Sequence, residues 1–326
     1  MKLLTIVVPM YNVELYIQKC LDSFVIPEAM DELEVLVIND ATPDGSRALA
    51  ATYEEKYPGT FRIIDKENGG HGSTVNRGIE EASGRYFKVV DGDDWVDHDG
   101  FLHLMEHLRT TDSDMVLSNY HWVDHSTGKK SLEVERICPA MEDYTEYPFP
   151  KVADHIFMKM HAVTYKTELL RNQPERLDEH CFYVDAEYML FPLPYIRTVS
   201  QIPDAVYQYR IGLPGQSMNL ENMKKRCGQH ERVLNRLLTF YDGVEDAACR
   251  DTIGMAIARF AVSQYKIYLS FSESHKQQLV STETKLRQDY PEIYRQMKNS
   301  AVTVLRKTGY TSYSLVSMLV RSLKKA

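Results

Sequence analysis

The chain has 326 residues, of which 44% are hydrophobic and 26% are charged, and its formal net charge is -8. This is the composition of a globular protein with room for two domains, and the negative charge argues against general nucleic-acid binding. Five dispersed cysteines without C-x-x-C spacing predict free thiols in a reducing, cytoplasmic compartment. The N-terminal run "LLTIVVP" ends at Pro9 and lacks a small-residue cleavage site, so it predicts a strand and not a signal peptide. No run of about 18 apolar residues occurs, so no membrane-spanning helix is predicted.

The first 90 residues alternate between predicted strands and predicted helices. Apolar runs predict strands over residues 3–9, 33–40, 61–65 and 85–90. The intervening segments predict helices over residues 12–25, 46–57 and 74–82, with Asn12 capping the first. This alternation predicts an α/β fold with a mostly parallel, doubly wound sheet. Ligands of such sheets bind beyond the carboxyl ends of the strands, so we expect Asp40 and Asp91 to face one crevice.

The pattern changes beyond residue 110. Residues 111–219 are rich in aromatic residues and prolines and predict no clear alternation, whereas residues 220–326 have apolar residues at helical spacing. Residues 301–326 contain five basic and no acidic residues. A helix over 311–326 would either lie on anionic lipid or pack as a last core helix with a solvated basic face. Its predicted apolar face consists of Val316, Leu319, Val320 and Leu323.

Three carboxylates follow the fourth predicted strand in "DGDDW", residues 91–95. One interpretation is a solvated acidic loop. A calcium loop is excluded because its twelfth position would need a carboxylate, and Leu102 stands there. A phosphotransferase with Asp91 as its nucleophile is a further alternative. The fourth interpretation is a Mg²⁺ or Mn²⁺ site for a nucleotide diphosphate, in which the ion offsets repulsion between the carboxylates.

The N-terminal third resembles the family 2 glycosyltransferases, which are inverting enzymes with the GT-A fold. The resemblance is carried by "TIVVPMYNVELYIQKCLDSF", "EVLVINDATPDGS", "NGGHGSTVNRGIEEASGRYFKVVDGDDWVD" and "FYVDAEYMLFPL". Four motifs in this order are specific, although each alone is weak. The resemblance implies a nucleotide-sugar-binding half over residues 1–110, an acceptor-binding half over 111–219 and a helical C-terminal region over 220–326.

The resemblance also implies roles for residues on the donor side. Asp40 would accept a ring N–H of the base, with a strand-end turn cap as its alternative role. Asn76 would contact ribose or phosphate, with a polar helix face as its alternative. Asp93 is the expected metal ligand, and Asp94 is expected to bind hydroxyls of the donor sugar. The expected nucleotide-binding residues are Pro9, Tyr11, Asn12, Asp40, Gly70, Asn76 and Asp91.

On the acceptor side, the resemblance implies that Asp185 is the catalytic base. Many family members have a Glu-Asp pair here, but Val184 precedes Asp185 in this chain. Glu187 is the alternative base, and a helix N-cap is the alternative role of Asp185. The segment "VYQYRIGLPGQSMN" resembles the part of the family that closes over the donor, with Arg210 and Ser217 on the diphosphate.

The expected function is therefore metal-dependent, inverting transfer of one sugar to a hydroxyl of a glycan or glycolipid, in cell-surface polysaccharide synthesis. A UDP-sugar is the expected donor, and Mn²⁺ or Mg²⁺ is the expected cofactor. The expected location is the cytoplasm, with peripheral contact at the inner face of the membrane through residues 311–326. The alternatives are the phosphotransferase and a nucleotide-sugar-binding protein without activity.

Overall fold

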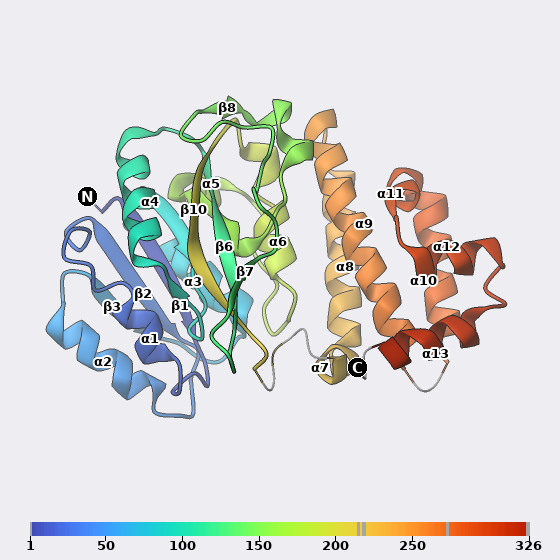
Figure 1. Cartoon of the computed structure of the whole chain (residues 1–326), viewed down its shortest axis with the longest axis horizontal. Coiled ribbons are helices and arrows are strands. Elements are labelled where there is room, and N and C mark those ends of the chain that lie inside the picture. The colour runs from blue at the N-terminus through green and yellow to red at the C-terminus, as the bar shows by residue number, and fades with distance from the viewer. Residues whose placement is uncertain (1, 214–215, 217–219, 272–273, 324–326) are drawn as a thin grey trace. The chain divides into compact units, whose positions relative to one another are not determined.

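The computed structural model describes residues 2–213, 216, 220–271 and 274–323 (Figure 1). The chain divides into two compact units, Met1–Leu213 and Pro214–Ala326. The first unit contains a mixed sheet, and the second is built from helices.

The sheet of the first unit is parallel where the sequence alternates between strand and helix. Its main strand order is β3-β2-β1-β4-β9-β6-β10-β5, and the pairs among β1 to β4 are all parallel. Strands β1, β2 and β4 consist mostly of buried residues, as a sheet covered on both faces requires. Strand β3, at the edge of the sheet, has one buried residue, Phe61. The strands are β1 (Leu4–Met10), β2 (Leu33–Asn39), β3 (Phe61–Asp65), β4 (Tyr86–Val89), β5 (Trp95–Val96), β6 (Met115–Asp124), β7 (Lys130–Leu132), β8 (Tyr147–Pro148), β9 (Val163–Lys166) and β10 (Thr198–Ile211).

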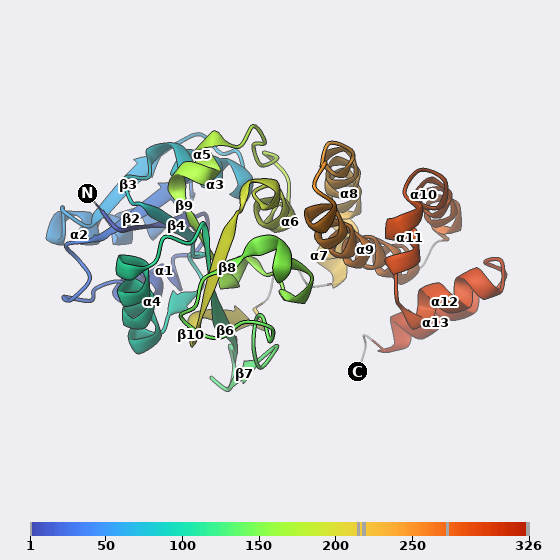
Figure 2. The ribbon, with the colours of Figure 1, turned by 90° about the horizontal axis from the view of Figure 1, so that it is seen from above.

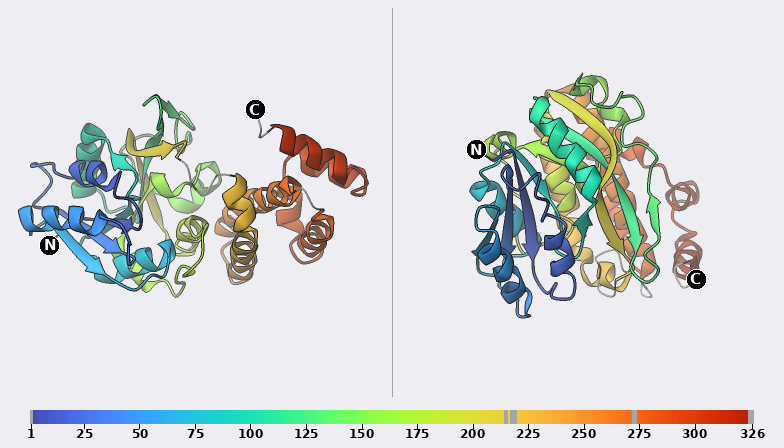
Figure 3. Two further views of the ribbon diagram at one scale, coloured as in Figure 1. Left: turned by 90° about the horizontal axis from the view of Figure 1, so that it is seen from below. Right: turned by 60° about the vertical axis from the view of Figure 1, so that its left-hand side comes forward.

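Helices cover both faces of this sheet (Figures 2 and 3). Helices α1, α2 and α4 lie on one face, where Phe24 and Phe101 meet edge to face, and α3 and α5 lie on the other. This follows from right-handed crossovers, because the strand order reverses direction between β3 and β4. The helices are α1 (Ile17–Asp22), α2 (Ser46–Lys56), α3 (His71–Glu81), α4 (His98–Thr110), α5 (Thr167–Asn172) and α6 (Asp185–Leu190).

The predicted alternation over the first 90 residues is confirmed, but two helix starts were wrong. The first helix begins at Ile17 and not near Asn12, which has a φ of 56° and donates its backbone N–H to Thr42 at 2.8 Å. The third helix begins at His71, three residues before the predicted start. As expected, Asp40 directly follows β2 and Asp91 closely follows β4.

The segment without a clear sequence pattern completes the same sheet. Strand β9 lies between β4 and β6 and is antiparallel to both, whereas β6 and β10 pair in parallel with bulges between Gln201 and Tyr207. The long strand β10 thereby carries its C-terminal residues to the loop that follows β4, since Arg210 donates its backbone N–H to Asp94 at 2.7 Å.

Helix α3 packs on β1 through Gly78, and we expect Gly78→Ala to destabilise the protein. An added Cβ would lie 2.4 Å and 2.8 Å from the two methyl carbons of Val7, which is fully buried. Such overpacking destabilises by about 1–3 kcal/mol, which exceeds the gain of up to about 1 kcal/mol that alanine brings to a helix. Denaturant unfolding measures the change. Gly59→Ala is the matched control, because no atom lies within 4 Å of its added Cβ, and equal stability of both variants would contradict this packing.

The second unit is helical, as predicted. Its buried contacts include the His230 ring stacked on Phe260 at 3.9 Å, and Glu283, which pairs with Arg306 at 2.7 Å and accepts from Tyr265 at 2.6 Å. Among the described residues, no helix combines the length and apolar character needed to cross a bilayer. The helices are α7 (Leu220–Lys225), α8 (Cys227–Asp242), α9 (Ala247–Ser270), α10 (Lys276–Asp289), α11 (Pro291–Gln296), α12 (Ser300–Lys307) and α13 (Tyr313–Leu323).

Candidate active site

The candidate site is built around the three carboxylates in the loop after β4. Asp91, Asp93 and Asp94 each offer one oxygen, and these oxygens lie within 4.8 Å of one another. Within the described ranges, this is the one cluster of at least three potential metal-ligating side chains. The preceding strand is fully buried, which fixes the start of the loop and forces the three acids together.

Burial and mutual repulsion shift the pKa values of this cluster. Burial and then the Asp91 charge raise the pKa of Asp93 to about 6. Burial, followed by Asp93 and Asp91, raises the pKa of Asp94 well above its usual value. Burial alone would also raise the pKa of Asp91, but His71 outweighs it and lowers that pKa. The cluster therefore concentrates negative charge that a cation would offset.

Protein donors occupy the Asp94 carboxylate of this cluster. Asp94 accepts from the Tyr207 hydroxyl at 2.6 Å and from the Arg210 backbone N–H at 2.7 Å. The contact of Asp94 with the donor sugar stays a prediction. The carboxylate of Asp93 and the second oxygen of Asp91 are suited to Mg²⁺ or Mn²⁺, which take one or two protein carboxylates together with phosphate and water oxygens.

His71 was not predicted to have a role, yet it contacts this cluster. It is the first residue of α3, and its Nε2 lies 2.8 Å from Oδ1 of Asp91. Burial lowers the pKa of His71, but Asp91 outweighs that effect, and Asp185 and Asp93 add to it, so the pKa is raised. His71 therefore couples the aspartates after β4 electrostatically to the predicted base.

Asp185 is the first residue of α6, exposed at the surface. Val184 is the N-cap of this helix, and no side chain caps it, so the alternative of Asp185 as an N-cap was wrong. Neighbouring protein atoms displace water from the Asp185 carboxyl, and this desolvation raises its pKa. The charge of His71 opposes that shift. The alternative base, Glu187, is fully buried and accepts from the Asp178 backbone N–H at 2.7 Å. Only Asp185 of the two is therefore placed to meet a substrate.

Arg210 lies beside the aspartate cluster, near the end of β10. Its Nε donates to the Asp93 carbonyl oxygen at 2.8 Å, and its guanidinium lies 4.8 Å from the Trp95 ring centroid and 5.0 Å from that of Tyr16. This places a positive charge beside the aspartate cluster, and the contact of Arg210 with diphosphate stays a prediction. Ser217, predicted to share that contact, lies outside the described residues.

Asp40 is buried and accepts hydrogen bonds from the turn that follows β3. Its side chain is 2% exposed, and its oxygens accept from Lys66 Nζ at 2.7 Å and from the Gly69 and Gly70 backbone N–H groups at 2.8 Å. Gly70 has a φ of 82°, a value that favours glycine, and its N–H serves this turn. Asp40 therefore stabilises this turn, and its contact with a nucleobase stays a prediction.

Asn76 links helix α3 to the backbone of Leu177. Its amide donates to the Leu177 carbonyl at 2.9 Å and accepts from the Leu177 backbone N–H at 3.0 Å. The contact of Asn76 with ribose or phosphate stays a prediction. Pro9, Tyr11 and Asn12, by contrast, lie at the carboxyl end of β1. Tyr11 is 51% exposed, and Asn12 is exposed as well, so both remain accessible to a ligand.

Because Lys88 is buried in the middle of β4, we expect the free energy of unfolding to depend on pH. Its side chain is fully buried, burial lowers its pKa to about 7, and its Nζ donates to the His161 and Val163 carbonyls at 2.8 Å and 3.1 Å. Between pH 7 and the unfolded pKa of about 10.4, the unfolded chain keeps a proton that the folded protein has lost. The free energy of unfolding should therefore rise by roughly 2 kcal/mol between about pH 7 and pH 9 through this group.

Denaturant unfolding across this pH range tests the expectation for Lys88. Lys88→Met should remove this part of the increase, whereas Lys129→Met, an exposed lysine in the turn after β6, should retain it. An unchanged pH slope in Lys88→Met would assign the increase to other groups.

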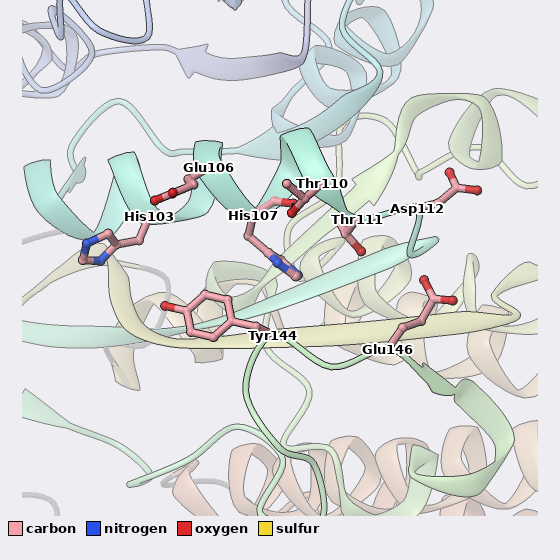
Figure 4. A pocket seen from close by; sticks show the side chains of 8 residues that line it. All are labelled: His103, Glu106, His107, Thr110, Thr111, Asp112, Tyr144 and Glu146. Atoms are coloured by element: carbon pink, nitrogen blue, oxygen red, sulfur yellow. The ribbon is translucent and has the colours of Figure 1, made fainter.

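A separate cavity of about 690 Å³ lies between α4 and the segment that precedes β8 (Figure 4). Tyr144 and His107 meet edge to face across it, with ring centroids 5.5 Å apart. None of its lining residues belongs to the aspartate cluster, so this cavity is distinct from the candidate active site. The lining residues are His103, Glu106, His107, Thr110, Thr111, Asp112, Tyr144 and Glu146.

Solved structures with the same fold cover nearly the whole chain. TarS of S. aureus, solved with UDP-GlcNAc, has a TM-score of 0.66 at 17% identity and covers 100% of this chain and 92% of that one. A mannosyltransferase of Pyrobaculum calidifontis, solved with GDP-Man and Mn²⁺, has a TM-score of 0.54 at 16% identity and covers 99% and 88%. The predicted α/β fold of the GT-A type, with helices at the C-terminal end, is confirmed.

Sequence relatives agree with this fold. The uncharacterized glycosyltransferase EpsJ of Bacillus subtilis is 28% identical over 265 residues, which are 79% of this chain and 75% of EpsJ. The putative glycosyltransferase EpsH of the same organism is 28% identical over 225 residues, 64% of this chain and 61% of EpsH. Residues 5–170, half of the chain, match the family described as Glycosyl transferase family 2. The chain therefore belongs to family 2 of the glycosyl transferases.

Proposed function

We propose that this chain transfers one sugar, with inversion, from a UDP-sugar to a hydroxyl of a glycan or lipid-linked acceptor in the synthesis of a cell-surface polysaccharide. The observation that carries this proposal is the placement of His71. Its imidazole contacts Asp91 of the metal-suited cluster at 2.8 Å and interacts electrostatically with Asp185, the exposed acid proposed as the base. We place the activity in the cytoplasm, at the inner face of the cell membrane.

On the donor side, Asp93 and Asp91 would hold Mg²⁺ or Mn²⁺, with His71 fixing the orientation of Asp91. A bound divalent ion would neutralise the charge that develops on the leaving diphosphate. Arg210, held by the Asp93 carbonyl, would add a positive charge to the same group. Pro9, Tyr11 and Asn12 would bind base and ribose.

On the acceptor side, Asp185 would remove the proton of the attacking hydroxyl. The acceptor oxygen then forms a bond to the anomeric carbon as the bond from that carbon to the diphosphate oxygen breaks, and the proton remains on Asp185. The raised pKa of Asp185 suits this task, because a base is most effective when its pKa approaches the working pH.

A thermal-shift panel tests the donor class first. UDP, GDP, dTDP, CDP and ADP are each added with Mn²⁺, with Mg²⁺ and with chelator. A saturating ligand that binds only the folded protein raises the apparent stability by mass action. We expect a metal-dependent shift with UDP that Asp93→Ala abolishes. A shift with another nucleotide alone would correct the donor, and no shift with any of them would overturn the proposal.

The sequence also allowed a phosphotransferase and a nucleotide-sugar-binding protein without activity. The phosphotransferase is not retained, because the chain belongs to a family of glycosyl transferases and Oδ1 of Asp91 is engaged by His71. A nucleotide-sugar-binding protein without activity is distinguished by the reaction itself. Binding of UDP-sugar with neither hydrolysis nor transfer, across a panel of glycan acceptors, would favour that alternative.

A further inference from the structure

Helix α13 leaves a row of large apolar side chains in contact with solvent. Leu315, Met318 and Leu319 are 56%, 52% and 52% exposed. Their spacing of three and four residues places them on one face of the helix. Exposed apolar residues are common singly, but a contiguous row on one helix indicates a surface that binds something.

The opposite face of α13 is fully used by the protein. Tyr313, Val316 and Ser317 are at most 6% exposed, and the Tyr313 and Ser317 hydroxyls donate to the Tyr268 and Leu269 carbonyls of α9 at 3.1 Å and 2.7 Å. Helix α13 therefore packs on α9 through this face (Figure 1), and the exposed row is a different face of the helix. This corrects the predicted apolar face, since Val316 packs inward and Leu319 points to solvent.

The charge around this row selects the kind of partner. Residues 301–326 contain no acidic residue, although the whole chain has a net charge of -8. Of their basic residues, Arg306 is paired with Glu283, but Lys307 is exposed and Arg321 flanks the row three residues after Met318. Lys324 and Lys325 follow in the sequence. A second copy bound across a two-fold axis would set this basic segment against its own copy, which disfavours a dimer through this face.

We propose that α13 docks on an anionic lipid surface, with Leu315, Met318 and Leu319 among the acyl chains and Arg321 at the headgroups. An amphipathic helix of this kind binds such surfaces in two ways. Its apolar side chains leave water, and its basic side chains are attracted to the anionic headgroups. The proposal concerns binding alone and does not depend on the sugar-transfer activity.

Co-sedimentation of the full chain with vesicles tests this docking. We expect binding to phosphatidylcholine vesicles that contain about 30% phosphatidylglycerol, weaker binding in high salt, and little binding to phosphatidylcholine alone. The triple variant Leu315→Ser, Met318→Ser, Leu319→Ser should lose at least about tenfold in partitioning, and Arg321→Gln about threefold. The triple variant should keep the wild-type melting temperature, because its three replaced side chains are each more than half exposed.

Leu132→Ser is the matched control, since Leu132 is 45% exposed on β7 of the first unit and should not affect partitioning. Binding by the triple variant equal to that of the wild type would overturn the proposal, as would the absence of binding to anionic vesicles. Light scattering measures whether the chain instead forms a dimer through this face. A dimer that the triple variant dissociates, without vesicle binding, would assign this face to a second copy and overturn lipid docking.

Discussion

Asp185→Asn is expected to lower the rate of sugar transfer by about 10²–10⁴-fold and to leave the affinity for nucleotide diphosphate unchanged. The asparagine keeps the size of the side chain but cannot take a proton from the acceptor. The donor-side residues Asp93 and Arg210 are untouched. Release of UDP in the presence of acceptor gives the rate, and calorimetric titration with UDP and Mn²⁺ gives the affinity.

Two further variants separate the loss of a base from the loss of a charge. Asp99→Asn removes one carboxylate that is 85% exposed on α4, so transfer should continue at the wild-type rate. Glu187→Gln changes a fully buried acid that holds the Asp178 N–H, so we expect a lower melting temperature in place of a selective loss of transfer. Wild-type transfer by Asp185→Asn would exclude Asp185 as the base.

The first four strands could be predicted because each is encoded by a local apolar run, which is buried in β1, β2 and β4 and partly exposed in β3. Helix starts depend on partners that are distant in the sequence, and there the prediction failed. Asn12 is a good N-cap residue by type, but its backbone N–H is bound by Thr42, thirty residues away, and its φ of 56° is not helical. His71 begins its helix because the turn before it is fixed by Asp40, again about thirty residues away.

The later strands could not be predicted because their neighbours in the sheet are set by long-range pairing. Strand β9 has four residues and lies between β4 and β6, each more than thirty residues away along the chain. A short strand of this kind carries no periodic pattern that could reveal its direction. The position of Arg210 beside Asp93 follows from the pairing of β10 with β6, and family resemblance was its only advance signal.

The acidic cluster could be predicted because its three members are neighbours in the sequence. The contacts that define its chemistry could not. Tyr207 reaches Asp94 across 113 residues, and nothing in the sequence around either one indicates the contact. The internal contacts of Asp40 and Asn76 could not be predicted either, because a polar side chain gives the same sequence signal whether it binds a ligand or the backbone of its own protein.

Asp93→Asn is expected to have opposite effects on stability in the absence and in the presence of ligands. In the metal-free protein, the folded-state pKa of Asp93 is about 6, against about 3.9 when unfolded. Between these values the folded protein keeps a proton that the unfolded chain has lost, so the stability from this group falls as the pH rises through about 6. At neutral pH, Asp93→Asn should therefore stabilise the metal-free protein by roughly 1–3 kcal/mol.

With Mn²⁺ and UDP present, the sign should reverse. At about 1,000 times its dissociation constant, a ligand stabilises the folded wild type by about 4.1 kcal/mol. Asp93→Asn should lose nearly all of that stabilisation together with transfer, and this loss exceeds the roughly 1–3 kcal/mol that the variant gains without ligand. Melting curves with chelator and with Mn²⁺ plus UDP, at about pH 5 and pH 8, measure both signs. Asp99→Asn should change neither. A variant that is less stable in both states would show that Asp93 supports the fold, whereas opposite signs require a site in which a ligand offsets a repulsion that the folded protein bears.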